Sequence, residues 1–554
     1  MEYLILVLAF LAVGAFVFCR GLWDARRQEV WQRKKMEENF GTRTARKYEE
    51  GEFEGIGGYL KKHQEKFQID DITWNDLNMD EIFVQMNSTC SSAGQEYLYY
   101  MLRTPSFDEK ELARRTELMD YFESHPKERL DIQMLYRKMG RTGKYSIYDY
   151  LDFLDVLGER KNGRILLVDI LLILSVALIA VSPQAGVISF GALLIFHITT
   201  YMKEKEKVEP YLVSFRYIFR TLTLAEGLGR HQESELQPEL ERIRSLLPAF
   251  KKLKKNASLG MQSLGGGGPM EMCMAYLNMM FHLDILCFNR MLRAVRERTD
   301  EIDLLLTIVG KLEAMIAAAG FRRSLDGYCQ PVLDSQTLEI KGVYHPLLTN
   351  PVKNDISTCR GVLLTGSNAS GKSTFLKAVA INAILAQTIH TCYAQEYRGS
   401  FCRVMSSMSL RDDLCGGESY YIVEIKSLKR ILEAVDAPGA PVLCFVDEVL
   451  RGTNTVERIA ASSQILLSLH RPGVRCFAAT HDIELTELLK KDYDNYHFEE
   501  EIIENDIRFP YRLMSGKAKT RNAIRLLSIM GYEESIIRRA EELAAQFLEK
   551  KSWG

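Results

Sequence analysis

The chain has 554 residues, of which 47% are hydrophobic and 26% are charged, and its formal net charge at pH 7 is −2. This length exceeds what one hydrophobic core usually holds, and the composition excludes a disordered chain, so we expect several folded domains. The near-zero charge excludes a uniformly basic surface, so any DNA contact would need a locally basic face. The 11 cysteines include no C-x-x-C pair, which favours reduced thiols over a disulfide framework or a zinc site built from cysteine pairs.

The first apolar segment covers residues 3–19, which are hydrophobic throughout. Nine lysines and arginines follow it between positions 20 and 47, whereas none precedes it. A cleaved signal peptide would instead carry positive charge before the apolar run and small residues at its end. The asymmetry therefore predicts a transmembrane anchor over residues 1–22, followed by a cytoplasmic segment.

A second apolar stretch covers residues 165–201 and is interrupted at Ser182-Pro183-Gln184. Each half has about the length of one membrane-crossing helix, and basic residues flank both ends. The pattern predicts a transmembrane hairpin over residues 164–202 that enters and leaves on the same side. The alternative is a hairpin buried in a soluble helical core. With three spans, the protein would be a multi-pass protein of the cell membrane, and the rest of the chain would lie in the cytoplasm.

Two regions around the hairpin have helical periodicity, and we expect them to form an all-α lever or core domain. Residues 23–163 would contain a cytoplasmic linker and the first part of this core, and residues 203–327 its second part. A glycine run at 265–268 marks a loop between long helices. Apolar residues at spacings of three and four predict a core-packed helix at Ile302, Leu305, Val309, Leu312 and Ile316.

The most specific motif follows a short apolar strand pattern at residues 361–365. Its sequence is Gly366-Ser367-Asn368-Ala369-Ser370-Gly371-Lys372-Ser373, followed by a helix that begins near Thr374. This G-x-x-x-x-G-K-S spacing lets backbone N–H groups surround phosphate oxygens, while the lysine reaches the β and γ phosphates and the serine hydroxyl coordinates Mg²⁺. We therefore expect an α/β P-loop NTPase domain over residues 328–554 that binds ATP and Mg²⁺ through residues 366–374.

Two further strand patterns end in polar residues. Residues 442–446 precede Asp447 and Glu448, and residues 474–479 precede Thr480 and His481. At the carboxyl ends of parallel strands these side chains would face a ligand. We expect Asp447 to hold Mg²⁺ together with Ser373, Glu448 to polarise the attacking water, and His481 to contact the γ-phosphate.

These motifs resemble those of the MutS family of DNA mismatch-repair ATPases, which are relatives of the ABC ATPases. Residues 447–455 resemble the family's D-E-x-x-R-G-T-x-T segment, residues 419–424 its S-x-x-x-x-E signature helix, and residues 479–481 its A-T-H sequence. Weaker similarity extends upstream to about residue 70. The resemblance implies a homodimer with two composite ATP sites, in which Ser419 acts in trans on the nucleotide of the other chain.

A fused ABC transporter is the alternative, because residues 414–418 (Leu-Cys-Gly-Gly-Glu) are similar to the transporter signature. However, Lys372 and Ser419 are only 47 residues apart, which leaves little room for the helical subdomain that transporters insert there. Three spans are also fewer than a transporter half usually has. The spacing and the R-G-T segment therefore favour the MutS resemblance.

Some departures from the family bear on function. About 50 residues separate the first apolar segment from the helical core, so we expect no mismatch-reading domain there, and we expect no terminal helix-turn-helix after Ala540. Leu450 stands where the family has glycine, and Asp482 where an aromatic residue often follows the histidine.

Two functions are therefore considered. The first is a membrane-anchored, MutS-like ATPase that couples hydrolysis to the binding of mismatched or branched DNA. The second is a membrane ATPase that uses the same dimer switch on a protein partner or a membrane component, without DNA.

Overall fold

The computed structural model describes residues 20–21, 23–24, 26–44, 46–48, 51–153, 162–261, 276–367, 369–408, 420–450, 453–503, 506–518, 524, 527 and 529–550. Most of the predicted anchor at residues 1–22 and the glycine run at 265–268 lie outside these residues. The chain divides into two compact units. The first unit comprises Met1–Gln64, Gln85–Tyr100 and Glu117–Ser324, and the second Glu65–Val84, Met101–Thr116 and Leu325–Gly554.

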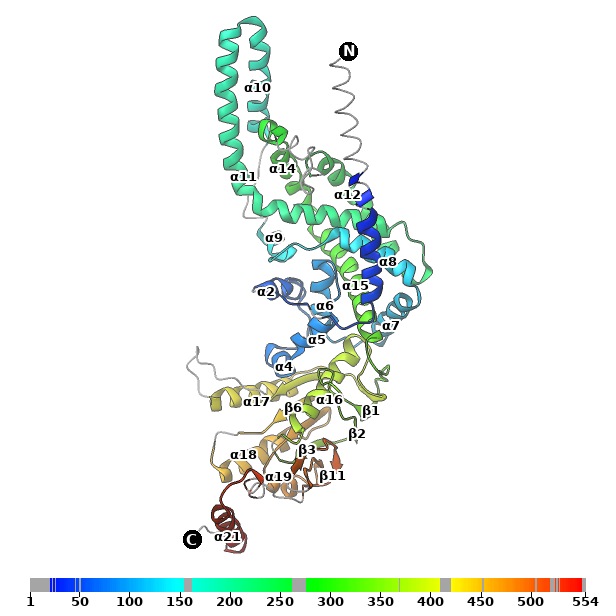
Figure 1. The fold of residues 1–554 in the computed structure, drawn as a ribbon, viewed down its shortest axis with the longest axis vertical. Coiled ribbons are helices and arrows are strands. Elements are labelled where there is room, and N and C mark those ends of the chain that lie inside the picture. The colour runs from blue at the N-terminus through cyan, green and yellow to red at the C-terminus, as the bar shows by residue number, and fades with distance from the viewer. Residues whose placement is uncertain are drawn as a thin grey trace. The chain divides into compact units, whose positions relative to one another are not determined.

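The described part of the first unit is helical, which confirms the predicted all-α character of this region (Figure 1). Residues 26–39 form a continuous helical stretch, and three of the divisions between the two units fall within helices, namely α5 (Met79–Met86), α6 (Ser92–Arg103) and α7 (Glu109–Ser124). The other helices are α2 (Glu52–Ile56), α3 (Gly58–Lys62), α6 (Ser92–Arg103), α7 (Glu109–Ser124), α8 (Pro126–Met139), α9 (Ile147–Phe153), α10 (Gly163–Val181), α11 (Pro183–Leu228), the 3₁₀ helix η2 (Ser234–Leu236), α12 (Gln237–Met261), α14 (Leu283–Arg296) and α15 (Thr299–Arg323).

Helix α15 lies in the core of this unit. Its predicted apolar stripe is at most 2% exposed at Ile302, Leu305, Val309, Leu312 and Ile316. The predicted core packing is confirmed, because an apolar stripe of this width is stabilised by removal from water.

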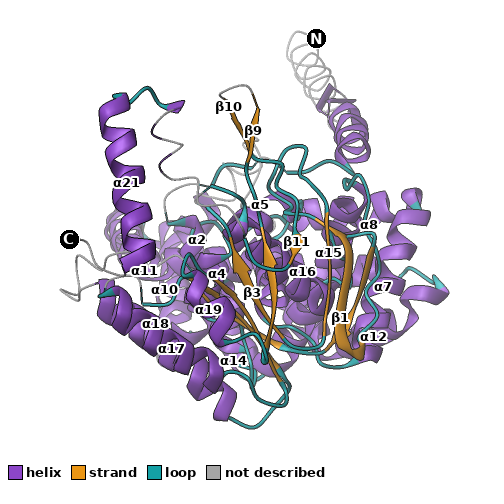
Figure 2. Ribbon diagram, turned by 90° about the horizontal axis from the view of Figure 1, so that it is seen from below, coloured by secondary structure: helices purple, strands orange, loops and turns teal. Residues whose placement is uncertain are grey.

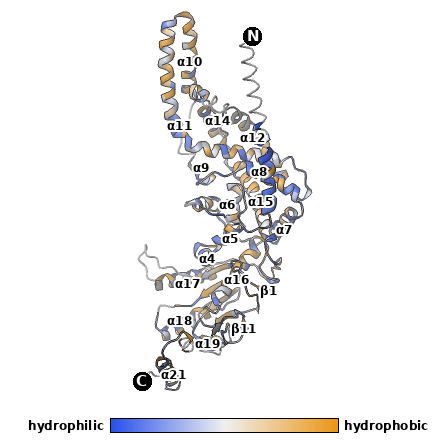
Figure 3. Cartoon of the chain, viewed as in Figure 1, coloured by the Kyte–Doolittle hydropathy of each residue, from blue (hydrophilic) through white to orange (hydrophobic). Residues whose placement is uncertain are grey.

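Helices α10 and α11 form the predicted hairpin, with the chain reversing at Ser182. Among the described residues, three helical segments are long and apolar enough to cross a membrane: Gly163–Val181, Pro183–Glu209 and Thr299–Arg323. In each of the first two segments, only 17% of the apolar stretch that could cross a membrane is buried, whereas 83% of the corresponding stretch is buried in the third segment. Figure 3 shows many hydrophobic residues along α10 and the first half of α11. Within the described part of the first unit, the hairpin is therefore not buried in the core.

Glu96 of α6 is a carboxyl group buried within the first unit. Its Oε2 accepts hydrogen bonds from the Tyr59 N–H at 3.0 Å and from the Ser146 hydroxyl at 2.7 Å. Burial disfavours the charged form more than these bonds favour it, and it raises the pKa of Glu96 to about 8.

We expect this group to make the protein less stable as the pH rises from about 5 to about 8. Because the folded-state pKa lies above the unfolded value, the folded protein holds an extra proton in this window, and the associated stability is lost as the pH rises through the folded pKa. The side chain of a Glu96→Gln variant does not titrate. Its free energy of unfolding should therefore lack this pH-dependent change, which is on the order of a few kcal/mol in the wild type. Melting curves of the detergent-solubilised chain across this range measure the effect.

Glu241→Gln, an exposed change on α12, serves as the control for this measurement and should retain the wild-type pH profile. An unchanged profile in Glu96→Gln would contradict the assignment.

The second unit contains a mixed six-stranded sheet with the order β11-β8-β3-β7-β6-β5 (Figure 2). Its neighbours pair in parallel except for β11, which pairs antiparallel with β8. The strands are β3 (Gly361–Thr365), β5 (Arg403–Ser407), β6 (Val442–Asp447), β7 (Val474–Ala479), β8 (Tyr493–His497) and β11 (Met514–Ser515). Two smaller antiparallel sheets consist of β2 (Asn354–Thr358), β1 (Asp334–Val343) and β4 (Glu396–Ser400), and of β9 (Glu501–Ile503) and β10 (Asp506–Arg508).

Helices α17 (Tyr420–Asp436) and α18 (Thr455–Ser468) pack against the six-stranded sheet. Buried apolar residues of β3, β6 and β7, such as Leu363, Cys444 and Cys476, share one core cluster with Leu428 of α17 and Leu466 of α18. The strands predicted at 361–365, 442–446 and 474–479 are confirmed. The helices of this unit are α4 (Asp71–Asp76), most of α5 (Met79–Met86), α16 (Lys372–Thr388), α17 (Tyr420–Asp436), α18 (Thr455–Ser468), α19 (Ile483–Leu488) and α21 (Glu534–Lys550).

The structure differs from the predicted domain division at residues 65–84 and 101–116. We expected both segments in the helical core, but they cluster with the C-terminal part of the chain. Asp76 of α4 accepts a hydrogen bond from the Ser406 hydroxyl at 2.7 Å, and Arg115 donates one to the Thr388 carbonyl oxygen at 2.6 Å. These bonds join positions 330 and 273 residues apart, so no local sequence pattern indicates them.

Candidate functional site

The glycine-rich loop lies between β3 and α16, as predicted. Gly366 has a φ of +145° and Gly371 a φ of +107°, values that favour glycine. A Cβ atom at Gly366 would lie 2.6 Å from the Phe498 carbonyl oxygen, and one at Gly371 would lie 3.1 Å from the Tyr511 ring. The backbone path therefore requires both motif glycines.

A cavity of about 480 Å³ opens on this loop. The predicted site residues in its wall are Ala369, Ser370, Gly371, Lys372, Ser373, Thr374, Glu448 and His481. The other described loop residues, Gly366 and Ser367, do not line the cavity but contact Lys372, which does. The Lys372 Nζ donates hydrogen bonds to the carbonyl oxygens of Gly366 at 2.9 Å and Ser367 at 2.8 Å. Asn368 and Ser419 lie outside the described residues.

The groups around the loop fit a phosphate ligand. Lys372 is a buried cation, with 5% of its surface exposed, at the first position of α16. The Ser370 hydroxyl is also buried, and it has no hydrogen-bond partner among the residues that the structure describes. A helix N-terminus, an ammonium group and an unsatisfied hydroxyl beside one cavity provide the donors that anionic oxygens prefer.

Glu448 and His481 line the cavity from the ends of β6 and β7. The Glu448 N–H donates to the Ala479 carbonyl oxygen at 3.0 Å, which ties the two strand ends together. Glu448 Oε1 and His481 Nε2 lie 2.9 Å apart. Asp482, which departs from the family pattern, forms a two-point ion pair with Arg458 of α18 at 2.6 and 2.9 Å and so anchors the segment that carries His481.

Asp447 is the last residue of β6 and is partly buried, but it is not among the residues that line this cavity. Ala479 of β7 is in register with both Asp447 and Leu364 of β3, so Asp447 lies at the sheet edge where the loop begins. Burial lowers the pKa of Lys377 on α16, and the nearby carboxylate of Asp447 opposes this shift. Binding of Mg²⁺ by Ser373 and Asp447 stays a prediction.

The turn after Glu448 is held by Glu424 of α17, whose buried carboxylate accepts a hydrogen bond from the Leu450 N–H. Both Glu448 and Leu450 have a φ of +59°, a conformation that costs a residue with a Cβ atom about 1–2 kcal/mol. This explains why glycine suits position 450. The sequence motif contains Glu424, but its role in positioning Glu448 is visible only in the structure.

Apolar side chains form much of the remaining wall, and sequence patterns did not identify them. Asn354 fixes one wall segment, because its side chain donates to the Tyr511 carbonyl oxygen at 3.0 Å and accepts from the Leu513 N–H at 2.7 Å. These residues come from segments without a recognisable motif. They include Tyr344, Leu348, Pro351, Val352, Phe498 and Tyr511.

His345 also lines the cavity. Its Nδ1 accepts a hydrogen bond from the Leu347 N–H at 3.3 Å. Burial, with a smaller contribution from the Lys377 charge, lowers the pKa of His345 to about 4. The ring is therefore neutral near pH 7, which suits contact with an uncharged flat group such as a nucleobase.

The strand order, the loop and the polar groups at the ends of β3, β6 and β7 define an α/β domain of the class that binds ligands at the carboxyl edge of its sheet. Residues 362–548 match MutS domain V. The C-terminal part of the chain is therefore similar to the MutS family, as the sequence motifs indicated.

Comparison with individual proteins gives the same result. The chain is 31% identical over 266 residues to the DNA mismatch repair protein MutS of Natronomonas pharaonis, covering 45% of this chain and 31% of that protein. It is 32% identical over 246 residues to the DNA mismatch repair protein MutS of Thermotoga maritima, covering 42% of this chain and 30% of that protein. It is 26% identical over 302 residues to the DNA mismatch repair protein MutS 2 of Haloarcula marismortui, covering 47% of this chain and 30% of that protein. The matched region thus spans about a third of the length of these relatives.

Proposed function

We propose that this protein is a membrane-anchored, MutS-like ATPase that binds ATP with Mg²⁺ in the cavity at the β3–α16 loop and hydrolyses it. The observation that carries this proposal is that one cavity brings together the glycine-rich loop, Lys372 and the Glu448–His481 pair. A phosphate cradle beside a carboxylate that can accept a proton is the arrangement that phosphoryl transfer to water requires. The match to MutS domain V favours ATP as the nucleotide.

Each residue has a defined role in this proposal. Lys372 contacts the β and γ phosphates through the ammonium group that otherwise binds the loop carbonyls. Ser373 and Asp447 hold Mg²⁺, which neutralises phosphate charge when it is bound. Glu448 accepts a proton from the attacking water, and His481 holds the Glu448 carboxylate and contacts the γ-phosphate.

We further propose a homodimer with two such sites. The family resemblance supports this arrangement, in which Ser419 of each chain completes the nucleotide site of the other chain. ATP binding closes the pair of ATPase domains and hydrolysis releases it, so the nucleotide acts as a switch.

We place the protein in the cell membrane as a multi-pass protein with its ATPase domain in the cytoplasm. The exposed hairpin supports this location, because Leu167, Val181 and Ile188 are 58%, 83% and 73% exposed. Apolar side chains exposed to this extent along two neighbouring helices are costly in water and stable in lipid. The apolar segment at 3–19 would add a third span.

The ATPase cycle is coupled, in this proposal, to mismatched or branched DNA. The names of the relatives support a DNA substrate. The exposed hairpin supports the second candidate function, in which the same switch acts on a protein partner or a membrane component.

DNA binding in different salt concentrations separates these two functions. We expect the detergent-solubilised chain to bind fluorescently labelled homoduplex, mismatched and branched DNA in a salt-dependent way, since contacts with phosphates release counterions. The measurement is made with and without ATP, beside an assay of Mg²⁺-dependent phosphate release. Hydrolysis without DNA binding at low salt would favour the second function, and the absence of hydrolysis would contradict both.

A further inference from the structure

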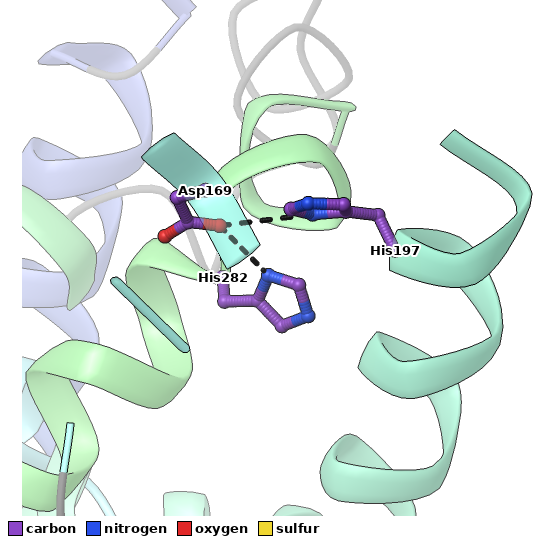
Figure 4. Close-up of side chains that lie close together, drawn as sticks. All are labelled: Asp169, His197 and His282. Atoms are coloured by element: carbon purple, nitrogen blue, oxygen red, sulfur yellow. Dashed lines mark hydrogen bonds and ion pairs between the residues drawn. The ribbon is translucent and has the colours of Figure 1, made fainter. Parts of the chain in front are cut away.

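Three side chains that are typical metal ligands converge within the first unit, at a site separate from the nucleotide cavity (Figure 4). They come from three elements: Asp169 from α10, His197 from α11 and His282 from the residue before α14. We propose that they bind a divalent transition-metal ion, with Zn²⁺ as the first candidate, and that this ion links the two hairpin helices to α14.

The distances fit coordination of one ion. One ligand atom from each residue lies within 4.8 Å of the other two. Asp169 Oδ1 is 3.6 Å from His197 Nδ1 and 3.3 Å from His282 Nδ1. With zinc–ligand bonds of about 2.0–2.2 Å, neighbouring atoms of a tetrahedral site are roughly 3.3–3.6 Å apart. Without an ion, His282 Nδ1 and Asp169 Oδ1 form a hydrogen bond at 3.3 Å, which is longer than the usual N–H···O distance of about 2.9 Å.

The hydrogen bonds of His197 leave its Nδ1 as a ligand atom. Its Nε2 lies 3.0 Å from the Val168 carbonyl oxygen, which can only accept, so Nε2 carries the proton of the neutral ring. The Nδ1 lone pair has no hydrogen-bond partner among the described residues, and Asp169 Oδ1 lies 3.6 Å from it. Metal-binding histidines commonly donate their second ring N–H to a backbone carbonyl in this way.

Burial of these side chains favours a cation at this position. The side chains of His197 and His282 are 0% and 1% exposed, and that of Asp169 is 10% exposed. A buried carboxylate beside the lone pair of a neutral ring is unfavourable unless a positive charge lies between them. His282 also has a φ of +49°, an unusual conformation for a residue with a Cβ atom, and a bond to a metal ion would offset its cost.

The ligand set indicates the class of metal. Two imidazole nitrogens and one carboxylate oxygen suit Zn²⁺, Fe²⁺ or Mn²⁺, whereas Ca²⁺ and Mg²⁺ prefer oxygen ligands throughout. His282 also lines a cavity of about 460 Å³. Because the ligands come from positions far apart in the chain, the bound ion would cross-link the hairpin and the helical unit.

The test is the metal content of the full chain, purified in detergent through an affinity tag without histidine. We expect zinc in equimolar amount in the wild type, and loss of this zinc in Asp169→Asn and in His282→Gln. His390→Gln, which removes a histidine of the second unit, is the matched control and should retain the metal. A chelator should lower the unfolding temperature of the wild type but not that of the two ligand variants.

Cobalt substitution distinguishes this site from binding by any of the 11 cysteines. The Co²⁺-loaded wild type should show d–d bands without thiolate charge transfer. A wild type that carries no metal and takes up no zinc, cobalt, iron(II) or manganese would overturn the proposal, and so would unchanged metal content in the folded ligand variants. If a variant fails to fold, the metal content and cobalt spectrum of the wild type decide the question alone.

Discussion

A Glu448→Gln variant is expected to hydrolyse ATP about 10²–10⁴-fold more slowly than the wild type while still binding it. Glutamine has the shape of glutamate, so the turn held by Glu424 should persist, but an amide cannot accept the proton of the attacking water. The turnover number from phosphate release with Mg²⁺ and ATP measures the first effect, and binding of a fluorescent ATP analogue measures the second.

The control for this variant is Glu484→Gln, which makes the same charge change at an exposed position on α19, outside the residues that line the cavity. It should leave both hydrolysis and binding unchanged. Undiminished turnover in Glu448→Gln would exclude Glu448 as the general base. Loss of binding together with turnover would instead assign Glu448 to the formation of the cavity.

Lys372→Ala is expected to weaken ATP binding by roughly 100-fold or more, because two charge-assisted hydrogen bonds to phosphate oxygens would be lost. The ammonium group is buried beside the loop and bonds to the carbonyl oxygens of Gly366 and Ser367. Lys372→Arg should restore binding only in part, because a planar guanidinium differs in shape from the compact ammonium group that fits this loop. Equilibrium titration with a labelled ATP analogue measures the affinity.

An effect on folding must be separated from an effect on affinity in this variant. Removal of Lys372 leaves two loop carbonyls without a donor, which costs about 1 kcal/mol each, so the unfolding temperature is measured beside the affinity. Lys429→Ala, an exposed change on α17, is the control and should bind ATP normally. Normal affinity in a folded Lys372→Ala variant would show that the loop lysine does not contact the nucleotide.

Local sequence patterns predicted much of the candidate site. The strand at 361–365 and the loop glycines were correctly placed, because alternating secondary structure and positive-φ positions leave clear signals over a few residues. The Glu448–His481 contact was only partly foreseeable. The sequence places both residues at strand ends, but the register Asp447↔Ala479 determines that their side chains meet.

Other parts of the site had no local signal. The wall segment held by Asn354 joins positions about 157 residues apart, and the contact of Asp76 with Ser406 spans 330 positions. Such contacts depend on the folded path of the whole unit, which explains why the sequence did not group residues 65–84 with the C-terminal part of the chain.

The sequence by itself determined the elements of this protein: the glycine-rich loop between a strand and a helix, the acids at a strand end, and an apolar hairpin interrupted at 182–184. Only the tertiary structure decided what surrounds each element. Helices α10 and α15 are both apolar and long enough to cross a membrane, yet one is mostly exposed and the other mostly buried, because apolar burial is non-directional and depends on which partners fold against a surface. The convergence of Asp169, His197 and His282 was decided in the same way. Residues this far apart in the chain become neighbours only when the helices that carry them pack together.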